Sequence, residues 1–198
     1  MQAQANFLAK YPGGFADPAM ESIKKKHDID RLSAFCRENL GKAAFNRPEH
    51  IVDTLAKIVS RSSMVSRFEK PPFKDFLRIL NSVEKQALAD AMEQRLHGNK
   101  RRGFEQLVGM LGPHKLAKWA LVSVVPFYYS PKTEAFVKPT TAKGIVAFLE
   151  VEELTYKPLP SWEFYQGYNK LIKAVKREVN SSLAPNNAAL TGFLMMSI

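Results

Sequence analysis

Residues 48–61 read PEHIVDTLAKIVSR, and this stretch decides the fold class. Its apolar residues recur every three or four positions, so they fall on one side of a helix: Ile51, Val52, Leu55, Ile58 and Val59. Pro48 suits the first helical position, where a backbone N–H is not needed. Lys57 and Arg61 form a short basic ridge on the polar side. The stretch therefore predicts an amphipathic helix with one face against a core.

The same spacing continues on both sides of this stretch. Further helices are predicted over residues 18–26, 28–40, 73–80, 82–97, 104–111, 116–125, 142–148 and 161–179. The segment 116–125 fits helix or strand by periodicity, and its surroundings favour a helix. Only residues 154–156, with Val151, read as strand, which is too little for a sheet. The prediction is an all-α, irregular multi-helix single domain of about seven to nine helices.

The two ends of the chain read differently from the middle. Residues 1–17 are predicted as an extended lead-in with a turn at Pro12-Gly13-Gly14. In the tail, residues 184–198, Asn186-Asn187 is polar, yet residues 192–198 are apolar to the last position, whereas free termini are usually polar. This tail is predicted to dock on the core or, as the second choice, on a partner chain. The single domain is taken to span residues 1–198.

Composition bounds the class of protein. Of 198 residues, 45% are hydrophobic and 24% charged, which is typical of a globular domain with a real core. Cys36 is the only cysteine, so an internal disulfide is impossible and a reducing compartment fits. No apolar run approaches the ~18 residues of a membrane span, and residues 1–10 do not read as a secretory signal. A cytoplasmic protein without a membrane partner is expected.

The net charge of +10 favours anionic partners, nucleic acid among them. Lys100, Arg101 and Arg102 precede an apolar helical stripe, where cations oppose the helix dipole. Cations kept at an electrostatically unfavourable position can have a functional use, here contact with phosphate. The alternative is that Arg101 and Arg102 are merely exposed, or pair with Glu105.

Two more groups of cations are candidates for phosphate contact. Lys170, Lys173 and Arg177, with Lys176 between them, recur at helical spacing and form a ridge of a single sign. Lys138 and Lys143 flank a predicted helix start at Thr140 or Thr141, whose free N–H groups could hold an anion.

Local catalytic motifs are absent from the sequence. It contains no G-x-x-x-x-G-K-[ST], no G-x-G-x-x-G and no G-x-S-x-G. The four histidines are scattered, so neither a metal site nor a cofactor is predicted, and Cys36 reads as a core residue. Glu150 and Glu152 could form a minimal Mg²⁺ pair in an extended segment, although a solvated loop is the preferred reading. Catalytic residues are left unassigned, and an enzyme is not favoured.

Four short patterns stand out along the chain: F-E-K…K-D, W-x-x-V…P-F, F-x-K-P-x-x-x-K and P-x-W-x-x-Y. Their residues are Phe68, Glu69, Lys70, Lys74, Asp75, Trp119, Val122, Pro126, Phe127, Phe136, Lys138, Pro139, Lys143, Pro160, Trp162 and Tyr165. With these patterns the chain resembles a family of uncharacterised bacterial proteins. The resemblance implies a bacterial, cytosolic setting and one continuous domain. It implies no activity and no catalytic residue.

Three functional hypotheses follow, in order of preference. The first is a non-enzymatic protein that associates with nucleic acid or another polyanion through the cations named above. The second is a protein-interaction subunit of a larger bacterial assembly, which uses the apolar tail and residues 126–129. The third is a hydrolase or nuclease whose site is assembled from distant residues such as Glu69, Asp75, Lys138 and Lys143.

Overall fold

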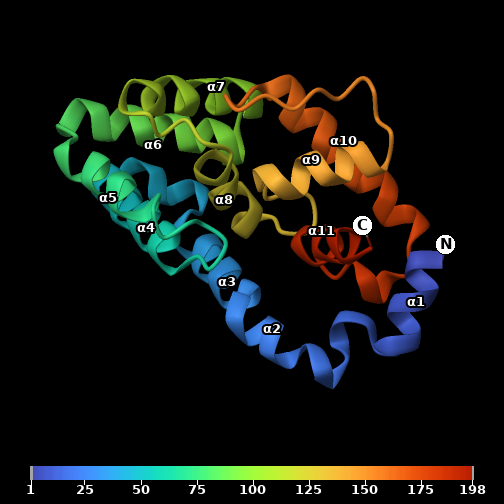
Figure 1. Cartoon of the computed structure of the whole chain (residues 1–198). Coiled ribbons are helices and arrows are strands. Elements are labelled where there is room, and N and C mark those ends of the chain that lie inside the picture. Colours follow the sequence, from blue (N-terminus) through green and yellow to red (C-terminus); the bar gives the residue numbers. More distant parts are fainter. Residues whose placement is uncertain (1, 198) are drawn as a thin grey trace.

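Eleven α-helices make up most of the computed structural model of the chain, which describes residues 2–197 (Figure 1). Their bounds are α1 Gln2–Lys10, α2 Glu21–His27, α3 Ile29–Asn39, α4 Pro48–Arg61, α5 Lys70–Ile79, α6 Ser82–His97, α7 Lys100–Leu111, α8 Trp119–Tyr129, α9 Pro139–Phe148, α10 Trp162–Glu178 and α11 Asn187–Met196. No strand occurs in residues 2–197, so the all-α prediction is confirmed. The helices outnumber the expected seven to nine, in part because both ends of the chain are helical.

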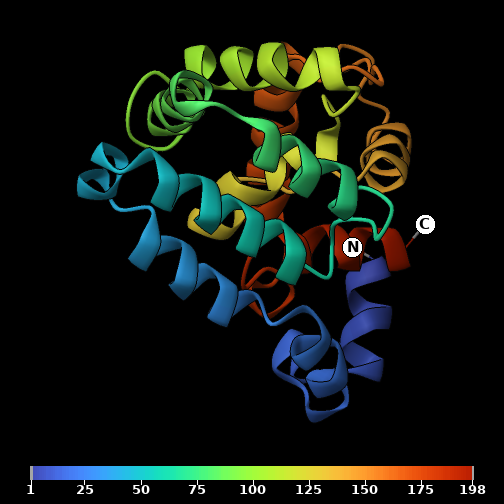
Figure 2. The same ribbon diagram turned by 90° about the vertical axis from the view of Figure 1, so that its left-hand side faces the viewer.

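Helix α4 forms as its sequence predicts. Its five stripe residues, Ile51, Val52, Leu55, Ile58 and Val59, are all buried. It packs against α3, α5, α6 and α8, and Figure 2 shows α3, α4 and α5 side by side in front of α8. One apolar stripe thus joins four neighbouring helices to one continuous core.

Helix α8 is the centre of the core. Every residue from Trp119 to Tyr128 is buried, as expected for a helix that is apolar on all sides. The helix reading of this segment is therefore confirmed, and the helix continues through Pro126 to Tyr129. The use of residues 126–129 as a partner contact is wrong, because Phe127 and Tyr128 have no exposed surface.

The extended lead-in predicted for residues 1–17 is wrong for residues 2–10, while the turn is present at Pro12-Gly13 and residue 1 lies outside the described residues. Residues 2–10 form α1, and the ring of Phe7 packs edge-on against Phe193 of α11, with 5.4 Å between centroids. Figure 1 shows α1 close to the chain's C-terminal end. The isolated sequence of α1 has a weak apolar pattern, so it is this tertiary contact that stabilises the helix.

The apolar tail docks on the core, which was the preferred reading. In α11 the side chains of Leu190, Phe193 and Leu194 are buried, while Met195 and Met196 remain exposed. Helix α11 packs against α9 and α10. The tail therefore contributes to the fold of this chain.

The strand predicted at residues 154–156 and Val151 is also wrong, because this segment is irregular. It lies against α8 and α10. Leu154 is buried close to Gly167 of α10. The indole N–H of Trp119 in α8 donates to the carbonyl of Lys157 at 2.7 Å. Alternation of buried and exposed residues is typical of any extended segment over a core, so the pattern alone resembled a strand.

Helices α6 and α7 approach each other closely at Gly103. A Cβ atom at this position would lie 2.6 Å from the carbonyl oxygen of Ala91, so only glycine fits. No helix within residues 2–197 is long and apolar enough to cross a membrane.

Candidate polyanion-binding surface

The first predicted cation cluster, at the start of α7, is largely occupied by carboxylates. Arg101 donates from Nε to Glu105 at 2.7 Å and from Nη2 to Glu163 at 2.8 Å. The alternative reading of Arg101 as an ion-pair partner of Glu105 is therefore confirmed. Arg102 is exposed and forms no ion pair within residues 2–197. Lys100 donates to Glu134 Oε1 at 2.8 Å, so only Arg102 keeps a free charge here.

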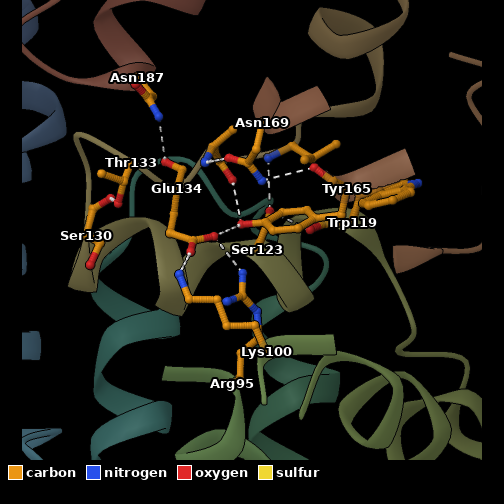
Figure 3. A network of polar contacts seen from close by, with 12 residues as sticks. Arg95, Lys100, Trp119, Ser123, Ser130, Thr133, Glu134, Tyr165, Asn169 and Asn187 are labelled. Atoms are coloured by element: carbon orange, nitrogen blue, oxygen red, sulfur yellow. Dashed lines mark hydrogen bonds and ion pairs between the residues drawn. The ribbon is translucent and has the colours of Figure 1, made fainter. Parts of the chain in front are cut away.

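Glu134 is the centre of a buried polar network that the sequence did not reveal (Figure 3). Its side chain is 10% exposed and accepts hydrogen bonds from Arg95 Nη2 at 2.7 Å, Lys100 Nζ at 2.8 Å and Tyr165 Oη at 2.9 Å. The network joins α6, α7 and α10 to the segment that follows α8. Both carboxylate oxygens have protein donors, so the arrangement is one that fixes helices in place.

Electrostatics keep this network charged. Burial alone would raise the pKa of Glu134, but Arg95 and Lys100 lower it to about 2. Burial also acts to lower the pKa of Arg95, and the charges of Tyr165 and Glu134 raise it on balance. Burial raises the pKa of Tyr165, so its hydroxyl remains a donor. The sequence carries one signal of the Arg95–Glu134 pair. Arg95 follows Leu88 and Ala91–Met92 at helical spacing, so it falls on the buried side of α6.

The second predicted cluster, on α10, is free. Lys170, Lys173 and Arg177 are exposed and form no ion pair within residues 2–197. At about 100° per residue they lie within about 60° of one another around the helix, and Lys170 and Arg177 are separated by about 10 Å along it. The opposite side of the helix is held in the core by Phe164, Tyr165, Tyr168 and Ile172.

Two further lysines extend this group. Lys176 Nζ donates to the carbonyl oxygen of Lys132 at 3.1 Å, and burial together with the charge of Lys132 lowers the pKa of Lys176. Neither lysine forms an ion pair in the described part of the chain. Around the axis, Lys176 lies about 120° from Lys170 on one side and Glu178 about 80° from it on the other side. We call Lys132, Lys170, Lys173, Lys176 and Arg177 the α10 cation face.

The third predicted pair, Lys138 and Lys143, flanks the first turn of α9 as expected. Both are exposed, and α9 begins at Pro139. Lys143 Nζ lies 4.9 Å from the centre of the Tyr156 ring, a cation–π contact. Lys138 lies near the end of α2, where burial and the charges of Lys26 and Lys138 lower the pKa of His27.

The proposed distant hydrolytic residues are not brought together. Glu69 precedes α5 and Asp75 lies in it, whereas Lys138 and Lys143 belong to α9, and Figure 1 shows α5 and α9 on opposite sides of the molecule. Asp75 pairs with Arg78 at 3.0 Å. Residues 2–197 contain no group of three or more His, Cys, Asp or Glu side chains that could hold a metal ion.

Cys36 is a core residue, as predicted. It is fully buried, and burial raises the pKa of its thiol to about 12. The thiolate form needed for nucleophilic attack is therefore negligible near neutral pH.

Comparison with protein-family models, with curated proteins and with solved structures gives no significant match to the chain. The resemblance to an uncharacterised bacterial family therefore stays a prediction.

Proposed function

We propose that this protein binds polyanions, nucleic acid first among them, through the α10 cation face. The observation that carries the proposal is that five cations gather on and beside one helix with no carboxylate partner in residues 2–197. The α7 cluster differs, because Lys100 and Arg101 are bound to glutamates. The proposal therefore rests on α10, and Arg102 is the remaining α7 contributor.

The physical basis is the release of counterions from a phosphate backbone. Each phosphate neutralised by a lysine or arginine frees condensed cations, so binding weakens steeply as salt rises. Contacts of this kind position a protein on nucleic acid without reading its sequence. The net charge of +10 would speed the encounter with any anionic partner. In the bacterial cytoplasm that the resemblance implies, nucleic acid is an abundant ligand of this charge.

The core side of α10 supports the rigidity that such a surface needs. Tyr165 and Tyr168 are buried, and Asn169 links the helix to the segment after α8 by accepting from the backbone N–H of Ala135 at 2.7 Å. The lysines therefore project from a fixed helix, and only their side chains must be ordered on binding.

The test compares two triple variants in fluorescence anisotropy with labelled duplex DNA at ~0.1 M salt. One variant carries Lys170→Ala, Lys173→Ala and Arg177→Ala. The control carries Lys25→Ala, Arg31→Ala and Arg78→Ala, three exposed cations that already have carboxylate partners. Both lower the net charge by three, so general attraction changes equally. We expect the α10 variant to bind at least about tenfold more weakly than the control.

Equal affinities of the two variants would contradict the proposal, because charge alone would then explain binding. Absence of binding by the unaltered protein at low salt would also contradict it. Circular dichroism of each variant shows whether the helices are retained.

A further inference from the structure

A polar hollow lies between α3 and the turn that follows α8. Its volume is about 530 Å³, within the range of about 300–1,000 Å³ common for small-molecule sites. The polar side chains that line it come from both walls: Asp30, Ser33, Arg37, Ser130, Lys132 and Thr133. Asp30, Ser33 and Arg37 follow one another at three and four residues, so they share one face of α3.

Ser33 marks the hollow as more than a surface depression. The residue is 1% exposed, and its Oγ has no hydrogen-bond partner among the described residues. Buried hydroxyls nearly always have a partner, and serine in a helix usually bonds back to the preceding turn. Ser33 is one of the residues that line the hollow, so a ligand oxygen that reached its covered hydroxyl would supply the partner that this donor lacks.

The charged groups at the rim are also free. Arg37 and Lys132 stand on opposite walls, and neither they nor Asp30 form an ion pair within residues 2–197. The planar guanidinium of arginine matches two oxygens of a phosphate, and the ammonium of lysine adds a second positive charge. A carboxylate such as Asp30 would repel phosphate but can accept a hydrogen bond from a ligand hydroxyl.

The wall opposite α3 is held in place by backbone hydrogen bonds. The carbonyl of Ser130 accepts from the N–H groups of Thr133 and Glu134, at 3.0 and 2.9 Å. The carbonyl of Pro131 accepts from the N–H of Asn187 at 2.8 Å, and the carbonyl of Lys132 accepts from Lys176. Such a turn loses little freedom when a ligand binds, which favours affinity.

We propose that this hollow binds the phosphate monoester of a small hydroxylated molecule. The phosphate lies between Arg37 and Lys132 and accepts from Ser33, while Asp30 accepts from a hydroxyl of the same ligand. The hollow shares only Lys132 with the α10 cation face, so it does not depend on polyanion binding. The same chemistry is offered by a free phosphorylated metabolite and by the 5′-phosphate at the end of a nucleic-acid strand.

The test is an NMR titration of the full chain with glycerol 3-phosphate, with glycerol as the ligand that lacks the phosphate. Glycerol 3-phosphate is expected to shift the amide signals of residues 30–37 and 129–133, and glycerol is not. Ser33→Ala removes a hydroxyl without a partner, so the fold is retained while affinity falls several-fold. Arg37→Gln is expected to weaken binding about tenfold or more. Lys42→Gln, at an exposed cation outside the hollow, is the charge control.

Two results would overturn the proposal: no shifts at 10 mM ligand, or equal affinities for the unaltered protein, Ser33→Ala and Arg37→Gln. A second titration with a short 5′-phosphorylated oligonucleotide and its 5′-hydroxyl counterpart identifies the source of the phosphate. Shifts in the hollow that require the 5′-phosphate support the strand end, and shifts with glycerol 3-phosphate alone support a metabolite. Either outcome is separate from the α10 variants, whose lysines and arginine at 170, 173 and 177 lie outside the hollow.

Discussion

Glu134→Gln is the substitution that probes the buried network most sharply. The amide keeps the shape of the side chain but removes the charge that faces Arg95 and Lys100. Burial alone would raise the pKa of Glu134, and these two cations instead lower it from 4.5 to about 2. At about 1.4 kcal/mol per pKa unit, this lowering corresponds to roughly 3 kcal/mol of stability at neutral pH.

The sign of the pH dependence follows from that lowered pKa. Because the folded-state pKa of Glu134 lies below the unfolded value, its contribution is complete above pH 4.5 and is lost as the pH falls towards 2. The amide of the Glu134→Gln variant does not titrate in this pH range. The difference in unfolding free energy between the two proteins should therefore shrink from about 3 kcal/mol at pH 7 to about 1 kcal/mol at pH 3.

Urea unfolding followed by circular dichroism at pH 7, 5 and 3 measures this difference. Glu105→Gln is the control, since Glu105 is exposed and its ion pair with Arg101 lies at the surface, where such pairs contribute little. The control should track the unaltered protein across the three pH values. A constant difference between Glu134→Gln and the unaltered protein from pH 7 to pH 3 would refute the reasoning.

Three further substitutions test the packing by urea unfolding at neutral pH. Gly103→Ala should lower the unfolding free energy by about 2 kcal/mol, because its Cβ would meet the carbonyl of Ala91, and an unchanged value would contradict the close approach of α6 and α7. Gly109→Ala, where a Cβ meets nothing within 4 Å, should instead raise it by about 0.5–1 kcal/mol, and a loss would show that the site is crowded. Phe7→Ala should lower it by about 3 kcal/mol and remove α1 from Phe193, while a neutral effect would mean that α1 is not docked.

Much of the fold could be predicted because the apolar stripes are local. In α4 the buried side is contained in a run of fourteen residues, and spacing alone identifies it. The ends could not be predicted, since α1 is stabilised by Phe193, which lies far away in the sequence. Residues 154–156 were predicted as a strand because their side chains are alternately buried against the helices and exposed, as in a strand.

The candidate site divides in the same way. The ridge of Lys170, Lys173 and Arg177 was predicted because all its members lie on one helix. The ion pair between Lys100 and Glu134 was not predicted, because the two residues are 34 positions apart and only the folded chain brings them together. Ser33 was missed although it interrupts an apolar face of α3, a position where a buried hydroxyl signals a possible ligand contact.

The salt dependence of DNA affinity tests the central claim most directly. The logarithm of the association constant is measured against the logarithm of salt concentration, for the unaltered protein and for the variant that lacks Lys170, Lys173 and Arg177. With a slope of about −0.9 for each phosphate contact, the loss of three contacts should make the slope shallower by about 3. The same slope for both proteins would show that α10 does not contact the phosphates.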